Sequence, residues 1–527
     1  MSNYYDYEKL LNQYKVSNSK SWIKLLKGLT TSQASSILRQ LIPDYFCSNA
    51  SLELHQSLKK TFPEFLKMIE NTSAYFSSFP KSGIPAQSKS ISTHVSPNMN
   101  AGIGIAKNSK SQILINSKLQ ETIDYLKPQS VSEQNWLKLT QSLFKYNNGL
   151  GAPWYRHLAK SRYLLDIKNK DLYLTIEKSL SISPIPVFGG TSGLNSVLDM
   201  FGGAGTPIVF PSTYWGNMNL ISDQKGLLKI KSDYIDINGD VHLNKLEETL
   251  NTLKEKGFHK VCLYFNFPHN PSGVVLSKKQ ALSLSKIIQK HACENFQIIN
   301  VCDEPYFPFV RGKQAIKSPI SAYLQPLYNK NIITFATING TKRDGMYGFR
   351  HSDLIILLAH DIEKDTINEI ENNLLAGYFR GCFSFSNSIN QYLLARSLSQ
   401  DPLVALKSPH DLEISQDYLK SESDSIQYMQ ECMNHSISFL DQISHLKRVQ
   451  QTEDACGGFF ASYQLDEVLV SAGITTMDIH QIGLKHNVGV ISAGSYIRIN
   501  GLIETESIQK FCSNLQETID SLLMKKN

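Results

Sequence analysis

The sequence predicts an α/β fold: a mostly parallel central sheet in a large domain, a smaller α/β domain and a helical N-terminal extension. Three observations predict it. Short apolar runs alternate with amphipathic segments through the middle of the 527-residue chain. The order strand, helix, strand is typical of parallel sheets with right-handed crossovers. Polar motifs follow the apolar runs, at the carboxyl ends of strands where such sheets bind ligands.

Residues 1–90 predict a helical extension that ends in a linker. Segments 21–41 and 52–69 carry apolar residues at three- and four-residue spacing, the period of an amphipathic helix. From residue 75 to residue 96 the chain is rich in Ser, Pro and Gly, which is typical of a linker. The extension holds ten Lys and one Arg against six acidic residues, a surplus of +5. We therefore expect a boundary near residue 90.

Six apolar runs predict the buried strands of the sheet, because strands covered on both faces are apolar throughout. They lie at 185–188, 206–210, 261–265, 297–304, 332–337 and 353–358. The amphipathic segment 277–293 predicts a crossover helix between the third and fourth runs. We expect a large domain over 115–414 and a small domain formed by 91–114 and 415–527.

Composition and charge exclude several classes of protein. Hydrophobic residues make up 41% and charged residues 19%, which argues against a disordered chain, a collagen or a coiled coil. A net charge of +6 is too small to indicate nucleic acid or an anionic membrane as the main partner. The start shows no signal peptide and no apolar run is long enough to span a membrane, so we expect a soluble, cytoplasmic protein. The eight Cys and fourteen His lack metal-ligand spacing, so no metal site is expected.

Polar motifs follow the third, fourth and fifth apolar runs. Asn270 and a Pro-Ser-Gly turn come after the third run, and Asp303 and Tyr306 end or follow the fourth. Lys342 follows the fifth, with Arg350 eight residues beyond it. Taken singly, each is more often a turn, a helix cap or a solvated charge. The combination, in this order, is specific.

This combination resembles the class I aminotransferases, the aspartate aminotransferase-like enzymes of pyridoxal-phosphate fold type I. The resemblance covers roughly residues 95–527. Other matching segments are NAGIG from Asn100 to Gly104, YNNGLGAPWY at 146–155, GGTSGLNSVLDMF at 189–201, YWGNM at 214–218, GGFF at 457–460 and YIRINGL at 496–502. It implies pyridoxal 5'-phosphate as cofactor, amino acid and 2-oxo acid substrates, and a homodimer with shared active sites.

The resemblance implies which residues hold the cofactor's ring. Lys342 would bind the cofactor's aldehyde covalently and move the substrate's α-proton as base and acid. Asp303 would keep the pyridine nitrogen protonated, which makes the ring an electron sink. Tyr306 and Asn270 would hydrogen-bond the ring's phenolic oxygen, and Trp215 would stack on its face.

The resemblance also implies how the cofactor's phosphate is bound. Gly190, Thr191 and Ser192 stand at the start of a predicted helix, where free N–H groups and the helix dipole bind anions. Arg350 would add a bidentate guanidinium. Tyr146 would reach the phosphate from the neighbouring subunit.

Three residues would bind the substrate. Arg498 would hold the α-carboxylate, and Gly104 belongs to the N-terminal loop beside it. Arg380 would bind the distal carboxylate of an acidic substrate across the subunit interface.

Four positions depart from the family pattern. Asn339 stands where a phosphate-binding serine is common, Met218 replaces the histidine that supports the aspartate, Ser352 replaces a frequent glycine, and Phe385 replaces an asparagine. Asp303 is therefore expected to have different supporting neighbours.

We predict an aminotransferase that exchanges an amino group between an amino acid and a 2-oxo acid. An acidic amino acid is one candidate substrate. A lyase or decarboxylase on the same scaffold stays open, because the protein decides which bond at Cα is broken. A cofactor-sensing transcriptional regulator is less favoured. Its DNA-binding part would be residues 1–90, which show no helix-turn-helix signature, so a helical cap on the active-site domain is favoured.

Overall fold

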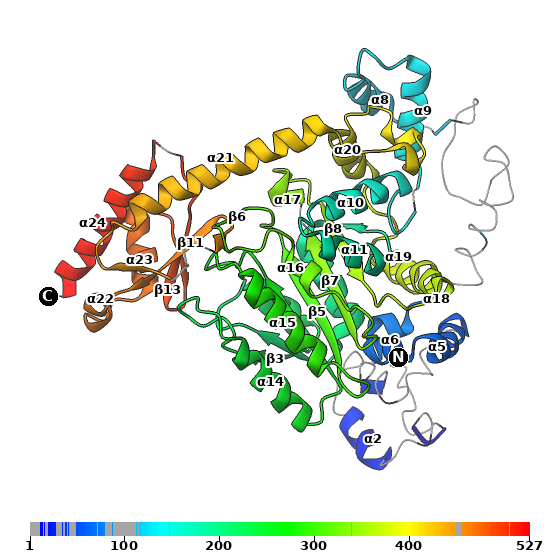
Figure 1. Ribbon diagram of the computed structural model, residues 1–527, viewed down its shortest axis with the longest axis horizontal. Coiled ribbons are helices and arrows are strands. Elements are labelled where there is room, and N and C mark those ends of the chain that lie inside the picture. The colour runs from blue at the N-terminus through cyan, green and yellow to red at the C-terminus, as the bar shows by residue number, and fades with distance from the viewer. Residues whose placement is uncertain are drawn as a thin grey trace.

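The computed structural model describes most of the chain beyond residue 48. The described residues are 49–70, 72–79, 115–146, 148–338, 340–449, 455–504 and 506–526, with 11–13, 15, 19–27, 34, 37–38, 41, 87 and 112–113. A central sheet carries helices on both faces, and a long helix joins it to a second, smaller sheet (Figure 1).

The central sheet has seven strands in the order β1-β8-β7-β5-β4-β2-β3. They are β1 (Ile185–Val187), β2 (Pro207–Phe210), β3 (Leu228–Lys231), β4 (Lys260–Asn266), β5 (Gln297–Glu304), β7 (Ile332–Ile338) and β8 (Ser352–Leu357). β3, β2, β4, β5 and β7 are parallel, whereas β8 is antiparallel to both β7 and β1. The predicted α/β fold with a mostly parallel sheet is confirmed. The edge strand β3 was not predicted, because three of its four residues are exposed and it lacks an apolar run.

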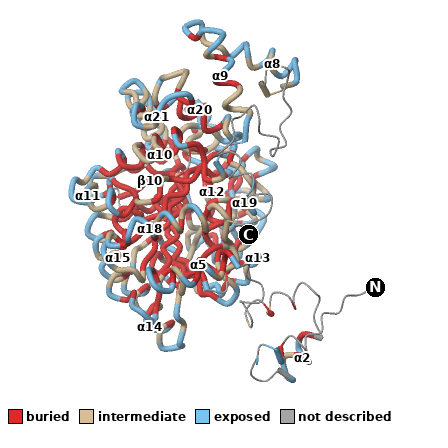
Figure 2. The backbone as a smooth tube through the Cα atoms, turned by 90° about the vertical axis from the view of Figure 1, so that its right-hand side faces the viewer, coloured by how far each residue is buried: buried red, intermediate tan, exposed pale blue. Residues whose placement is uncertain are grey.

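Alternate residues of β2, β4, β5, β7 and β8 face two separate cores. On one face, Val261, Leu263 and Phe265 of β4 pack with helices α10 (Pro153–Leu165), α11 (Lys170–Ser179), α14 (Leu243–Glu255), α15 (Lys278–His291) and α16 (Ile320–Tyr323). On the other, Cys262 and Tyr264 pack with α12 (Gly189–Val197), the π-helix η2 (Leu198–Gly202) and α13 (Asn217–Gln224). Figure 2 shows the buried backbone concentrated in this central layer. Because both faces of these strands are buried, their sequences are nearly continuous apolar runs.

The N-terminal helices cover part of the second face. α5 (Asn49–Thr61) and α6 (Pro63–Ile69) lie where one helix was predicted over 52–69, because Pro63 begins a new helix. Phe65 of α6 contacts Phe201 edge to face, with ring centroids 5.7 Å apart. The helix α18 (Lys364–Glu369), the π-helix η3 (Ile370–Leu375) and α19 (Ala376–Phe383) pack in the same core. Helices α5 and α6 therefore cover part of the large sheet.

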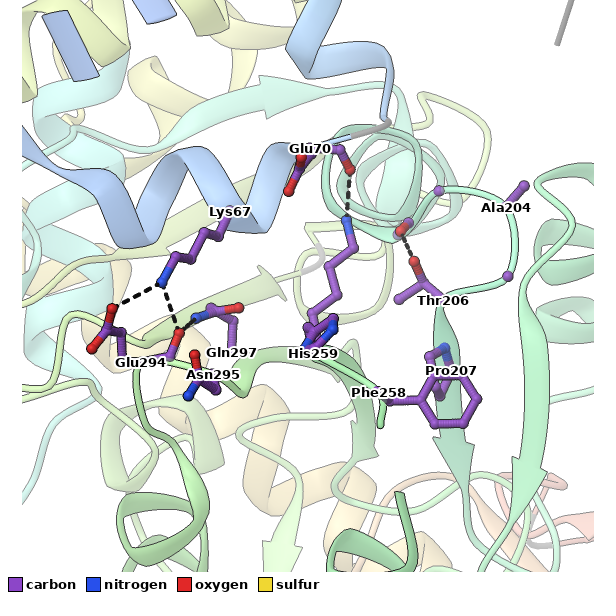
Figure 3. Close-up of a pocket in the computed structure, with 14 residues that line it drawn as sticks. Lys67, Glu70, Ala204, Thr206, Pro207, Phe258, His259, Glu294, Asn295 and Gln297 are labelled. Carbon is purple, nitrogen blue, oxygen red and sulfur yellow. Dashed lines mark hydrogen bonds and ion pairs between the residues drawn. The ribbon is translucent and has the colours of Figure 1, made fainter. Parts of the chain in front are cut away.

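Polar contacts hold α6 at the edge of the sheet where the parallel strands begin. Lys260 Nζ donates to the main-chain carbonyls of Met68 and Glu70, each at 3.0 Å. Lys67 Nζ donates to the carbonyl of Glu294 at 3.0 Å (Figure 3). A cavity of about 390 Å³ lies beside these contacts. It is at the opposite edge of the sheet from the strand ends that carry the predicted motifs.

The smaller sheet is antiparallel and has the order β12-β13-β11-β9. Its strands are β9 (Leu446–Arg448), β11 (Phe460–Leu465), β12 (Ile491–Ala493) and β13 (Tyr496–Asn500). They share a core with α21 (Gln416–Leu440), α22 (Glu467–Ser471), α23 (Thr476–Gly483) and α24 (Ile508–Lys526). Most of the expected contribution of 91–114 falls outside the described residues, so that part of the domain division stays a prediction.

Helices α8 (Ser117–Asp124), α9 (Glu133–Phe144) and α20 (Ser388–Ser399) lie at one end of the large domain (Figure 1). A short two-stranded pair, β6 (Val310–Arg311) with β10 (Cys456–Gly457), joins the large domain to the segment before β11. Within the described residues, no helix has the length and apolar character needed to cross a membrane.

Candidate active site

The predicted motifs meet at the carboxyl ends of three neighbouring strands. Asn266 at the end of β4 pairs with Asp303 on β5, and Asp303 pairs with Thr337 on β7. Parallel strands end at one edge of the sheet, so the loops that follow them lie together. Asn270, Tyr306 and Lys342 belong to these loops.

Asp303 is buried and held by neutral donors. Its side chain is 5% exposed. Tyr264 donates to Oδ2 at 2.9 Å, Asn266 Nδ2 donates to the same oxygen at 3.2 Å, and Thr337 donates to Oδ1 at 3.4 Å. Burial raises the pKa of Asp303 to about 6, although the Tyr264 and Thr337 hydrogen bonds oppose the rise. Among the described residues, no Lys or Arg forms an ion pair with it.

Tyr264 and Asn266 are the supporting residues that the sequence did not reveal. Met218, in the place of the family's histidine, is fully buried in the apolar core beneath. The signal was present in β4, where the period of two places Tyr264 and Asn266 on the same face of the sheet. The sequence did not show that the side chains on this face of β4 reach Asp303.

Lys342 lies on the short helix α17 (Gly340–Arg343), which follows β7. Its half-buried ammonium is 5.8 Å from the Tyr306 ring centroid and 4.9 Å from that of Tyr347. Burial lowers the pKa of Lys342, and the charges of Arg350 and Arg498 lower it further. In the described part of the chain, no carboxylate is among the charges that shift it. Tyr347 is a neighbour that sequence reasoning missed.

Arg350 packs against the start of α12. Gly189 has a positive φ of 77°, and a Cβ on it would lie 2.9 Å from Arg350 Nη2. A Cβ on Gly193, one turn later, would lie 2.7 Å from Thr337 on β7. The two glycines therefore let α12 approach both the guanidinium and the sheet. The helix terminus and the arginine together make a site suited to a phosphate.

The loop residues proposed for the phosphate lie at that terminus. Gly190 is buried, whereas Thr191 and Ser192 are partly exposed, and all three are in the first turn of α12. Asn339, in the place of the family's serine, lies outside the described residues.

Arg498 reaches the same site from the small domain. It lies on β13, donates from Nη1 to Asn270 Oδ1 at 3.1 Å, and stacks with its Cζ 4.2 Å from the Phe460 ring centroid. Burial lowers the pKa of Arg498, and the nearby Tyr306 opposes that shift. Phe460 is a further contact that the sequence did not single out.

Tyr306 is buried against two aromatic side chains of the small domain. Its ring centroid lies 5.3 Å from that of Phe459 and 5.6 Å from that of Phe460. Burial, together with the charge of Asp303, raises the pKa of the Tyr306 hydroxyl well above its ordinary value. The phenol is therefore neutral and able to donate a hydrogen bond.

A cavity of about 380 Å³ opens beside Arg498. Its walls include Tyr214, Trp215, Asn219, Asn270, Tyr496 and Arg498. Half-buried Trp215 thus lines the same cavity as the two polar residues predicted for the site. Asn270 and Arg498 line the cavity. Tyr306, Lys342 and Arg350 join the same group through other interactions, because Lys342 lies beside Tyr306 and its pKa is lowered by the charges of Arg350 and Arg498.

Tyr146 and Arg380 lie apart from this group, and both contact the ring of Phe385. Tyr146 is 58% exposed and stacks on Phe385 with centroids 5.0 Å apart. Arg380 stands over the same ring, with its Cζ 5.1 Å from the centroid. No contact between either residue and Lys342 is seen within the described residues. Gly104 lies outside them.

Comparisons with known proteins agree with this arrangement. The family model "Aminotransferase class I and II" matches residues 132–515. No curated protein sequence matches the chain.

Several solved structures share the fold. An aminotransferase from Anaerococcus prevotii is 17% identical, with a TM-score of 0.56 over 82% of this chain and 94% of that one. The aromatic aminotransferase of Pyrococcus horikoshii is 16% identical, with a TM-score of 0.53 over 78% and 100%. Aspartate aminotransferase from Thermus thermophilus with maleate is 14% identical, with a TM-score of 0.53 over 82% and 95%.

The family match covers most of the chain, including every strand of the central sheet and the strand that carries Arg498, and the resemblance stated from the sequence is confirmed. The protein is an enzyme that belongs to the class I and II aminotransferases.

Proposed function

We propose that this enzyme uses pyridoxal 5'-phosphate on Lys342 to exchange an amino group between an amino acid and a 2-oxo acid. The observation that carries the proposal is the position of Lys342. Its amine is half-buried, flanked by Arg350 and Arg498, and stands at the strand edge that holds the buried Asp303.

The residues present fit the cofactor. Asp303 is a buried carboxylate whose described partners are all neutral, and a protonated ring nitrogen would supply the missing cation. The first turn of α12 and Arg350 converge as a phosphate site requires. When bound, pyridoxal phosphate supplies an aldehyde that reacts with amines and a ring that accepts electrons from the substrate's Cα.

The chain's own residues would then divide the work. Because its pKa is lowered, a larger share of Lys342 Nζ is neutral near pH 7, so it can take a proton from the substrate's Cα and return one. Arg498 would hold the substrate's α-carboxylate, while its contact with Asn270 fixes the guanidinium. The neutral Tyr306 hydroxyl would donate a hydrogen bond to the ring's phenolic oxygen.

A homodimer with shared sites is part of the proposal. Tyr146 is exposed and stacks on the partly buried ring of Phe385, over which the partly buried Arg380 also stands. In a dimer Tyr146 would reach the phosphate of the other subunit and Arg380 the distal carboxylate of an acidic substrate. Gly104 would complete the substrate pocket. A cytoplasmic location remains a prediction from the sequence.

Borohydride reduction followed by peptide mapping tests the role of Lys342. We expect the label on Lys342 alone, and we expect Lys342→Ala to transaminate at least roughly 10²–10⁴-fold more slowly, the usual contribution of a proton-transfer group. Lys330→Ala is a matched control, because Lys330 pairs with Asp361 on the surface.

A label on another lysine would refute the assignment. Product analysis separates the alternatives: a 2-oxo acid supports transamination, whereas carbon dioxide or ammonia would indicate a decarboxylase or lyase.

A further inference from the structure

A buried ionic network adjoins the turn that carries Lys342. It joins that turn to α10 and to α21, the long helix that runs toward the small domain (Figure 1). Its members are Arg162 and Asp166 of α10 and its C-terminus, Arg343 and Asp344 beside Lys342, and Tyr418 and Glu422 of α21.

Arg343, the residue after Lys342, forms ion pairs with two carboxylates. It donates to Asp166 from Nη1 and Nη2 at 2.5 and 2.9 Å, and to Glu422 from Nε and Nη2 at 2.6 and 2.9 Å. Its side chain is 3% exposed. Two bidentate contacts leave a guanidinium one orientation, so α10, α17 and α21 are held at a common point.

Arg162 makes a second connection between the same helices. It donates to both oxygens of Asp344 at 2.8 and 2.6 Å and to Glu422 Oε1 at 2.7 Å. The Tyr418 hydroxyl donates to Asp344 Oδ1 at 2.6 Å and is also bonded to Arg162. Burial raises the pKa of Asp344, but the charges of Arg162 and Arg343, together with the hydrogen bonds from Arg162 and Tyr418, outweigh it, so the net pKa is lowered and the carboxylate stays charged.

The other end of α21 is built into the small domain. Met433, Ile437 and Leu440 of its last turns are buried in the core that also holds Ile497 and Ile499, which flank Arg498 on β13. Glu422 lies in the second turn of this 25-residue helix. At about 1.5 Å per residue the helix is a rod of about 37 Å. One rigid element therefore connects the Lys342 turn with the strand that carries Arg498.

We propose that the contact of Arg343 with Glu422, here called the α21 clamp, is a positioning device that sets Lys342 relative to Arg498. It deepens the function proposed above and rests on it for its catalytic meaning. Because the end of α21 is packed in the small domain's core, any displacement of that domain would reach the Lys342 turn through the clamp. Neither Arg343 nor Glu422 touches the substrate in this assignment.

Glu422→Gln is the informative change, because it leaves no guanidinium without a carboxylate. Arg343 keeps Asp166, and Arg162 keeps Asp344. The side-chain volume is nearly unchanged. Breaking a buried ion pair destabilises a protein mainly because it leaves one buried charge without a partner. Glu422→Gln leaves no such charge, so this variant is expected to fold.

The control is Glu371→Gln. Glu371 accepts from Arg156 Nη2 at 2.6 Å, and the two side chains are 18% and 10% exposed, so the pair is similarly buried. Arg156 is also on α10 but contacts the carbonyls of Ser183 and Pro184 rather than the Lys342 turn. Both variants lose the same chemical group.

The readout is the pKa of Lys342 in cofactor-free protein, from the pH dependence of its acetylation by acetic anhydride, mapped by mass spectrometry. Removing the negative charge of Glu422 by itself would leave this pKa unchanged or lower it, since Glu422 is not among the charges that raise it. Loosening the turn would instead free Lys342 from burial and from Arg350 and Arg498, and so raise it. We expect a rise of roughly 0.5–1 unit in Glu422→Gln and no change in Glu371→Gln.

Two outcomes overturn the clamp: an unchanged or lowered pKa of Lys342 in Glu422→Gln, or equal shifts in both variants. If Glu422→Gln fails to fold, Glu422→Asp is measured instead, since it keeps the negative charge but shortens the side chain that accepts from Arg343. Should borohydride label another lysine, the proposed function fails, yet the acetylation result still decides the clamp.

Discussion

Asp303 is a buried carboxylate supported by a tyrosine. Tyr264 donates a hydrogen bond to it, and Met218, at the position where the resemblance implies a histidine, is buried in the apolar core. A phenol donates one hydrogen bond and carries no charge near pH 7, so it stabilises the ionised carboxylate without adding a cation. The pKa of Asp303 therefore stays as high as about 6, within reach of physiological pH.

We expect pyridoxal phosphate to bind the cofactor-free protein more tightly as the pH rises through about 6. Burial raises the pKa of Asp303 to about 6, so the carboxylate that would pair with the protonated ring nitrogen is lost as the pH falls below that value. Asp303→Asn should bind the cofactor roughly 10–100-fold more weakly above neutral pH and should lack this part of the rise. Fluorescence titrations from about pH 5 to about pH 8 measure both.

Tyr264→Phe is the companion variant. Its hydroxyl lowers the pKa of Asp303, so removing it should move the midpoint of the rise to higher pH. The cofactor's own phosphate titrates equally in all three proteins. Parallel curves for wild type and Asp303→Asn would mean that Asp303 does not contact the ring.

At the scale of elements, α12 depends on its glycines. Gly189 turns the chain with a positive φ and gives Arg350 room, and Gly193 lets the helix lie against β7. The proposed phosphate site would thus depend on the approach of a helix terminus to a loop that lies more than 150 positions away in the sequence.

Gly189→Ala should weaken cofactor binding more than it weakens the fold. The positive φ costs a non-glycine residue about 1–2 kcal/mol, and the new Cβ displaces Arg350 from the helix terminus. Gly205→Ala is the matched control, because Gly205 has a φ of 78° and no atom within 4 Å of the added Cβ. The temperature of thermal unfolding should fall by a similar amount in both variants, whereas the affinity for the cofactor should fall about tenfold only in Gly189→Ala. Equal affinities would remove Arg350 from the phosphate site.

At the scale of the whole molecule, Tyr146 and Arg380 lie away from Lys342, beside the ring of Phe385. Tyr146 is 58% exposed, whereas Arg380 and Phe385 are partly buried. Aromatic residues and arginine are enriched in protein interfaces. The homodimer proposed above would bring Tyr146 and Arg380 to the site of the second subunit.

Mixing two inactive variants tests the shared sites. Lys342→Ala chains and Tyr146→Phe/Arg380→Ala chains should form heterodimers in which all the changes fall in one site and the other is intact. Random exchange between dimers should restore about a quarter of the wild-type activity. Assays of the mixture against each parent alone, with an acidic and a neutral amino acid, provide the measurement. No recovery would indicate sites built within a single chain.

The sequence was sufficient to place the central strands and to collect the candidate site. A strand buried on both faces must be apolar along its whole length, so β1, β2, β4, β5, β7 and β8 were visible as runs. The candidate site could be collected because Asn270, Asp303 and Lys342 follow successive runs in an order that resembles a known family, although each residue taken singly is more often part of a turn, a helix cap or a solvated charge. Short elements such as β3, whose residues are mostly exposed, leave no such pattern.

Only the tertiary structure decided which residues support that site. Glu422 is 79 positions from Arg343, and Asp166 is 177 positions from it. A buried arginine and an exposed one are identical in a sequence, because burial and pairing arise only when α10, α17 and α21 meet. The sequence by itself determined which groups could do the chemistry; the packing of distant helices decided how Lys342, Asp303 and Arg498 are held, because ion pairs and hydrogen bonds depend on distances that the order of residues does not contain.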